Sequence, residues 1–347
     1  MRGSLPAALL AVAFALLGAA CGPVSMTFVL GARDGKLRET TVLADEGKGL
    51  AAAKVALIDV RGLIAESPPS RALGLISGGP GPVDEFVARL QKAEEDGNVR
   101  AVILRINSPG GSVAASQLMY NELRRFRETT GKPVVASLGE VAASGGYYLA
   151  LGADEIVAQP TSITASIGVI IPTINVSEGL RRIGVVSRSV KSGENKDLAN
   201  PLEPMRDQQY AVLQAMVDEF YAAFRGLVVE RRSSAPNALV TARLDELTDG
   251  RVVTGAEAVR AGLADHEGDL RDAFERAKSL AGIEKARLVK YYGQYDPPPR
   301  TAYAATGAPP PQASADPNVL MLDLGPLAPG ASLTPGTAYY IWTAAVP

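Results

Sequence analysis

Two residue types that can carry out acyl transfer together occur in this chain: a serine flanked by glycines and a lysine further along. Ser144 lies in the run Ala-Ala-Ser-Gly-Gly-Tyr-Tyr, and Lys196 lies in the run Lys-Ser-Gly-Glu-Asn-Lys-Asp. A serine hydroxyl needs a base to become a nucleophile, and a lysine amine can be that base when burial or nearby positive charge lowers its pKa. The single histidine, His266, lies in a polar stretch. The residues therefore favour a serine/lysine dyad.

Two glycine-rich turns each follow a strand-like apolar run. The turn Asn-Ser-Pro-Gly-Gly (107–111) follows the run 99–106, and the turn with Ser144 follows the run 134–138. At the carboxyl ends of parallel strands such turns can present backbone N–H groups as an oxyanion hole. Each feature also has a structural explanation, because glycine permits tight turns and serine is a favoured helix N-cap. The residues alone leave both explanations open.

The elements that must position these residues follow an alternating pattern. Five apolar runs predict strands, at 55–60, 99–106, 134–138, 156–158 and 185–190. Helical periodicity predicts amphipathic helices at 83–95, 113–126 and 206–230. Such alternation is typical of an α/β domain with parallel strands. The apolar stripe of the third helix, which we expect to pack in the core, consists of Tyr210, Leu213, Met216, Val217 and Phe220.

The N-terminus has the zones of an export signal: Arg2, an apolar run at 5–17 and small residues up to Cys21. This stretch resembles the lipobox at which bacterial lipoproteins are cleaved and acylated, although Gly18 stands where an aliphatic residue is usual. The alternative is an ordinary cleaved signal with a chance cysteine. We expect a signal peptide at 1–20, lipidation of Cys21, and an exported lipoprotein that faces the periplasm or another extracytoplasmic space.

The rest of the chain divides by composition. Segment 21–53 is expected to be a membrane-proximal spacer, with a hairpin of 27–30 and 36–43. Segment 54–292 is expected to be the catalytic domain. Segment 293–347 is a tail rich in proline, alanine and glycine whose apolar end, 339–346, has no assigned place.

The balance of charges and the lack of ligand motifs argue against nucleic-acid-binding, metal-binding and phosphate-binding proteins. Lysine and arginine total 35 against 37 for aspartate and glutamate, so we expect no nucleic-acid partner. No His, Cys or carboxylate cluster has metal-ligand spacing, and 31–36 is one residue short of a phosphate-binding loop. We therefore predict no metal and no cofactor.

Several short motifs, in order and with matching spacing, resemble the signal peptide peptidase A family over about 55–280. They are Ser-Pro-Gly-Gly (108–111), Ala-Ser-Gly-Gly-Tyr-Tyr (143–148), Ser-Ile-Gly-Val (166–169), the lysine run at 191–197 and Asp-Gly-Arg-Val (249–252). The resemblance implies the crotonase-like fold of the Clp-type proteases, with parallel βα units.

The resemblance also implies the roles of individual residues. Ser144 would be the nucleophile, Lys196 the general base, and Ser166 the hydroxyl that orients the lysine. Gly111 and Gly145 would supply the oxyanion N–H groups, while Lys191 matches a position outside the dyad and 249–255 a structural turn. Half-length members of the family form rings in which serine and lysine come from adjacent protomers, so the single copy here implies a homo-oligomeric ring.

The expected function is a membrane-anchored serine endopeptidase that degrades remnant signal peptides or other extended apolar peptides. Two alternatives from other classes remain. One is a catalytically silent, membrane-anchored binding scaffold in which the glycines only shape loops. The other is an acyl-thioester enzyme of the crotonase type, against which the export signal argues.

Overall fold

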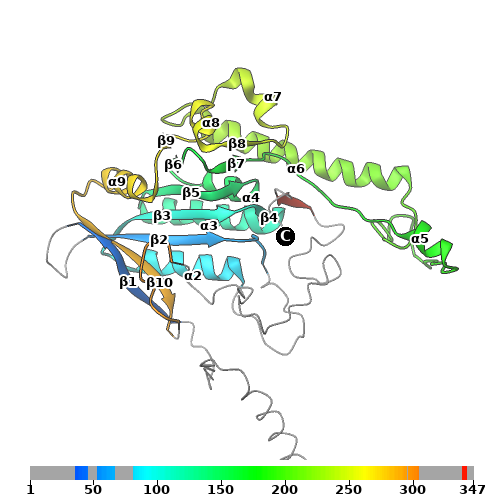
Figure 1. The fold of residues 1–347 in the computed structure, drawn as a ribbon, viewed down its shortest axis with the longest axis horizontal. Coiled ribbons are helices and arrows are strands. Elements are labelled where there is room, and N and C mark those ends of the chain that lie inside the picture. The colour runs from blue at the N-terminus through cyan, green and yellow to red at the C-terminus, as the bar shows by residue number, and fades with distance from the viewer. Residues whose placement is uncertain (1–35, 46–52, 67–80, 295, 305–337, 342–347) are drawn as a thin grey trace, which may run out of the picture.

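The computed structural model describes residues 36–45, 53–66, 81–294, 296–304 and 338–341 (Figure 1). The predicted signal, Cys21 and most of the proline-rich tail lie outside these residues. Among the described helices, none is long and apolar enough to cross a membrane.

A mostly parallel sheet forms the centre of the described chain, with the order β1-β10-β2-β3-β5-β6-β9. From β10 to β9 the strands run parallel to one another, and β1 is an edge strand antiparallel to β10. The strands on this path are β1 (Leu37–Ala44), β10 (Ala286–Gly293), β2 (Ala53–Arg61), β3 (Val99–Ser108), β5 (Val134–Ala143), β6 (Glu155–Ala158) and β9 (His266–Glu267). Off this path, β7 (Ile163–Ala165) pairs with the end of β5 and with β8 (Val252–Thr254).

Helices cover both faces of the sheet. The larger core packs one face of β2, β3 and β5 against α2 (Pro82–Glu95), α3 (Val113–Thr130) and α4 (Gly145–Ala150). The smaller core packs the opposite face against α9 (Leu270–Leu280). The central strands are therefore continuously apolar, and each fully buried Val, Leu or Ile side chain stabilises the fold by about 1.5–3 kcal/mol.

A long helix and an extended segment project from this body (Figure 1). The arm, defined as residues 171–206, contains α5 (Ser177–Arg182) and leads into α6 (Asp207–Ser233). The C-terminal half of α6 contributes Phe224 and Val228 to the larger core. The remaining short helices are η1 (Thr241–Arg243), α7 (Leu244–Leu247) and α8 (Gly255–Arg260).

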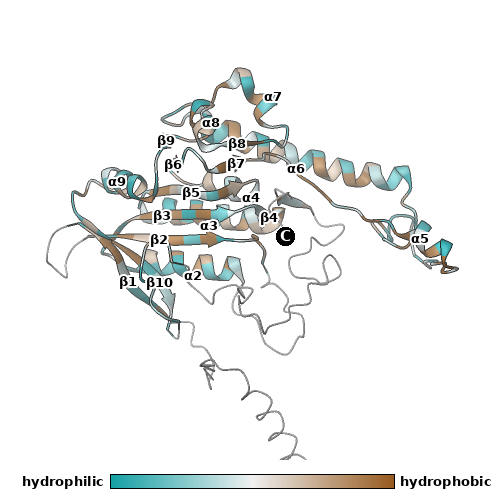
Figure 2. Cartoon of the chain, viewed as in Figure 1, coloured by the Kyte–Doolittle hydropathy of each residue, from teal (hydrophilic) through white to brown (hydrophobic). Residues whose placement is uncertain are grey.

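The arm corrects two expectations. The run 185–190 is not a strand, and Val186 and Val190 are 80% and 103% exposed. The stripe of α6 is not uniformly core, because Tyr210 and Met216 are 49% and 39% exposed whereas Leu213 is buried. Figure 2 shows hydrophobic stretches along the arm as well as along the central strands. The described part of the chain thus leaves Val186 and Val190 exposed and covers Tyr210 and Met216 only in part.

The predicted strands at 55–60, 99–106, 134–138 and 156–158 and the three predicted helices are present with shifts of a few residues at their ends. The predicted hairpin strand at 27–30 lies outside the described residues. Strand β1 lies in the segment expected to be a spacer, and it pairs with β10. The described residues of the tail also contact the body. The carbonyls of Ala302 and Ala304 accept hydrogen bonds from Lys290, and residues 339–341 form strand β11.

Candidate active site

Ser144 lies between the end of β5 and the first turn of α4. Its φ of 52° and ψ of −113° place it outside the regions that non-glycine residues favour, at a cost of about 1–3 kcal/mol. Its N–H donates to the carbonyl of Ala165 (2.7 Å), and its carbonyl accepts from the N–H of Tyr148 (2.7 Å). Strain held by surrounding bonds in this way is typical of functional sites.

The side chain of Ser144 does not act as a helix cap. It makes no capping hydrogen bond, although the residue holds the N-cap position of α4. The residue is 1% exposed, and its Oγ has no hydrogen-bond partner among the described residues. A buried hydroxyl without a partner costs free energy, so its presence needs an explanation beyond local structure.

Two glycine N–H groups meet beside this serine. A Cβ built on Gly145 would lie 3.1 Å from the nitrogen of Gly111, and one built on Gly110 would lie 2.7 Å from the nitrogen of Gly145. The pairing of Ser108 with Ala142, at the ends of β3 and β5, sets the two turns side by side. Since Gly110 has a φ of +106°, the turn requires glycine there.

Hydrogen bonds fix the turn at 107–111, which contains Gly110 and Gly111. The Oγ of Ser108 donates to the carbonyl of Gly62 (2.6 Å) and accepts from the N–H of Gly110 (3.0 Å). The N–H of Ile64 donates to the carbonyl of Gly110 (2.8 Å). The nitrogen of Gly111 is thus held in place before any ligand arrives.

Ser166 lies next to this group. It follows Ala165, whose carbonyl accepts from Ser144, and both residues have positive φ angles of 53° and 64°. The N–H of Ser166 donates to the carbonyl of Arg251 (2.8 Å), so the turn at 249–252 supports the site through its backbone. The structure therefore brings together Ser144, Ser166 and both predicted oxyanion glycines.

Lys196 is not part of this group within one chain. It is exposed, in the arm, and Figure 1 shows the arm apart from α4 and β4. Its N–H donates to the carbonyl of Gly193 (3.2 Å). Lys191 forms an ion pair with Asp197, and its hydrogen bond holds the pKa of Asp197 below the usual value.

The pairing of strand β11 and an aromatic cluster near Ser144 were not assigned from the sequence. Strand β4 (Gly110–Ser112) pairs with β11 (Tyr339–Ile341), and the residue that meets the other edge of β11 is Ile170. The aromatic cluster is built from Tyr120, Tyr148 and Phe224. The apolar end of the tail was the available signal, but sequence periodicity does not show where a distant strand docks.

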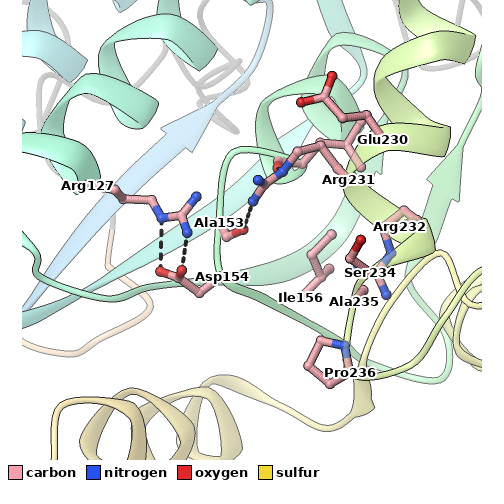
Figure 3. Close-up of a pocket in the computed structure, with 11 residues that line it drawn as sticks. Arg127, Ala153, Asp154, Ile156, Glu230, Arg231, Arg232, Ser234, Ala235 and Pro236 are labelled. Atoms are coloured by element: carbon pink, nitrogen blue, oxygen red, sulfur yellow. Dashed lines mark hydrogen bonds and ion pairs between the residues drawn. The ribbon is translucent and has the colours of Figure 1, made fainter.

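A pocket lies away from Ser144, between the ends of α3 and α6 (Figure 3). Its arginines already have partners. Arg127 pairs with Asp154, Arg231 donates to the carbonyls of Leu151 and Ala153, and Arg232 pairs with the buried Asp265. These bonds join the helices to the sheet, so we regard the pocket as structural.

Comparison with known proteins identifies the family. The profile of peptidase family S49 matches residues 127–284, and that of Clp protease matches residues 82–166. A putative signal peptide peptidase SppA of Enterococcus faecium is 31% identical over 293 residues, which cover 79% of this chain and 83% of that protein. A putative protease of Synechocystis is 34% identical, over 68% of this chain and 77% of that protein.

A longer relative gives the same result. Protease 4 of Salmonella typhi is 37% identical over 216 residues, which cover 61% of this chain and 34% of that protein. The buried serine, the paired glycine turns and the mostly parallel sheet with its Clp-like segment agree with these matches. The chain belongs to peptidase family S49 and is a serine peptidase of the signal peptide peptidase A type.

Proposed function

We propose that this chain is an exported, membrane-anchored endopeptidase that cleaves extended apolar peptides, remnant signal peptides among them, with Ser144 as nucleophile and Lys196 as base. The observation that carries the proposal is the buried Oγ of Ser144, which has no partner among the described residues and whose next residue, Gly145, lies against the nitrogen of Gly111. The name of the Enterococcus relative supports the signal-peptide substrate, and the sequence of residues 1–21 supports the anchor.

The reaction follows from these groups. The Oγ of Ser144 attacks the carbonyl carbon of the peptide while the neutral amine of Lys196 takes the hydroxyl proton. The N–H groups of Gly111 and Gly145 stabilise the oxyanion, and each such donor is worth about 10²–10³ in kcat. The C–N bond then breaks, and the leaving amine takes the proton from the lysine. The same lysine then takes a proton from water, and the water oxygen attacks the acyl carbon. The bond from that carbon to the Oγ of Ser144 breaks, and the Oγ takes the proton back from the lysine as the carboxylate product leaves.

Lys196 can act only if it reaches Ser144 from a second copy of the chain. In one chain it is exposed on the arm, apart from the turns that hold Ser144. The arm carries exposed apolar residues, including Ile183 (72%), Val186 (80%) and Val190 (103%), that a second copy would cover. A contact between the arm of one copy and the Ser144 face of the next would be heterologous, and the ring that the family resemblance implies is the closed form of such a contact.

Fluorophosphonate labelling together with peptide hydrolysis tests the nucleophile. We expect the wild type to be labelled and active, Ser144→Ala to be neither, and the exposed control Ser279→Ala to match the wild type. Labelling that persists in Ser144→Ala would show that another residue is the nucleophile. Wild-type protein without labelling or activity would favour the silent scaffold instead.

A further inference from the structure

One polar side chain at the start of α6 is buried although its neighbours in the helix are not. Gln209, in the first turn, is 3% exposed, whereas Gln208 is exposed and Tyr210 has 49% of its surface in solvent. Burying an amide costs free energy unless its hydrogen bonds are made. The partners of Gln209 therefore show what this residue holds.

The amide nitrogen of Gln209 holds the chain on both sides of Lys196. Its Nε2 donates to the carbonyl of Glu194 (3.1 Å), two residues before the lysine, and to the Oδ1 of Asp197 (2.9 Å), the residue after it. The other oxygen of the same carboxylate pairs with Lys191. The lysine loop, defined as residues 193–200, is thus attached to α6 at two points that flank the lysine.

Capping of the helix uses the opposite end of this amide. The Oε1 of Gln209 accepts from the N–H of Arg206 (3.1 Å), which closes the capping box of α6. A cap needs only that oxygen, so the two bonds from Nε2 to the loop are additional. The guanidinium of Arg206 supports them, because its Nη2 donates to the carbonyl of Glu194 (2.5 Å). Capping alone therefore does not explain the contacts of Gln209.

The far end of α6 is bound to the helix that follows Ser144. Arg231 donates to the carbonyls of Leu151 and Ala153 (2.9 and 3.0 Å), directly after α4, and Phe224 lies in the larger core. At 1.5 Å per residue, the 27 residues of α6 span about 40 Å. Figure 1 shows this helix running from the body towards the arm. One continuous helix therefore connects the nucleophile's helix with the lysine loop of the same chain.

We propose that Gln209 is a positioning residue for the reaction: its amide and the carboxylate of Asp197 form a clamp that holds the lysine loop in the shape in which Lys196 enters the site of a neighbouring copy. The inference rests on the proposed function. Misplacing a catalytic group by about 1 Å can cost about 10²-fold in rate. The clamp fixes the loop before two copies meet, so the lysine arrives already oriented.

Steady-state kinetics of the assembled protein test the clamp. In Gln209→Ala we expect kcat for peptide hydrolysis to fall about 10–10²-fold with KM little changed, because the base is misplaced while the peptide-binding surface is intact. Asp197→Ala should act in the same direction. The double variant should lose no more than the weaker of the two single variants, because both changes remove the same bond.

A neighbouring glutamine supplies the matched control. Gln208→Ala changes an exposed residue one position earlier, and its kcat should equal that of the wild type. Light scattering and thermal unfolding should show that Gln208→Ala and Gln209→Ala assemble and fold like the wild type.

Three results would overturn the inference while Lys196→Ala remains inactive. The first is a Gln209→Ala variant with the kcat of the wild type. The second is a double variant in which the two losses multiply, because the residues would then act separately. The third is a Gln209→Ala variant that fails to fold or assemble, because the residue would then support the arm rather than orient its lysine. A Lys196→Ala variant as active as the wild type would instead overturn the proposed function.

Discussion

Mixing two inactive variants tests whether one site takes its serine and its lysine from different copies of the chain. Ser144→Ala removes the nucleophile, and Lys196→Ala removes the base. Each variant alone should lose about 10⁴-fold or more in kcat, since residues of one catalytic unit fail together. In the structure Ser144 is 1% exposed in the body, whereas Lys196 is exposed on the arm.

The expected recovery follows from random pairing. An intact site needs the serine of a Lys196→Ala copy and the lysine of a neighbouring Ser144→Ala copy. With equal amounts of both variants around a heterologous ring, about one quarter of the contacts meet this condition. Co-expression should therefore restore about a quarter of the wild-type activity. If both groups came from one chain, every chain in the mixture would lack one of them, and nothing would be restored.

The assay is peptide hydrolysis by mixed oligomers that are purified through two different tags. The control is co-expression of Ser144→Ala with the double variant Ser144→Ala/Lys196→Ala, which has no intact serine in any pairing. Mixed oligomers that carry both tags and stay at the level of this control would refute the reasoning.

Three further predictions concern the site, the arm and the aromatic cluster. A Cβ on Gly111 would lie 1.9 Å from the carbonyl oxygen of Ile64, so Gly111→Ala should displace the oxyanion N–H and lower kcat about 10²–10³-fold. The control Gly97→Ala should leave kcat unchanged, because a Cβ on Gly97 would have nothing within 4 Å. Val190 is fully exposed, so Val190→Asp should change the free energy of unfolding of one chain by less than about 0.5 kcal/mol. The same variant should abolish assembly, measured by light scattering, and therefore peptide hydrolysis. Burial raises the pKa of Tyr148 to about 12, so the stability that its neutral hydroxyl contributes is intact below pH 10 and is lost between pH 10 and 12. In urea unfolding, the free energy of unfolding of Tyr148→Phe should therefore fall less steeply over this pH range than that of the wild type.

The sequence by itself determined the local elements that flank the chemistry. The runs that became β2, β3, β5 and β6 are continuously apolar because both faces of a parallel strand are covered, and such a pattern can be read locally. The position of Ser144 between a buried strand and a short helix was predictable for the same reason. The short motifs resembled the signal peptide peptidase A family, and the comparisons confirmed a serine peptidase of that type.

Apolar patterning misled where the described residues of the chain leave an apolar segment exposed. The run 185–190 has the composition of a strand, yet Val186 and Val190 face solvent. Periodicity reports that a residue is apolar, and it cannot report whether its own sheet or another copy buries it. The exposed Tyr210 and Met216 of α6 follow the same rule.

Only the tertiary structure decided how the site is assembled. The register of β3 with β5 brings the nitrogens of Gly111 and Gly145 together, although the two residues are distant in the chain. The docking of Tyr340 against Tyr148 depends on shape and on one hydrogen-bond acceptor, the carbonyl of Phe220, rather than on any local pattern. Pairing between remote segments is set by the whole packed core, so the turns could be read from the sequence while the space between them could not.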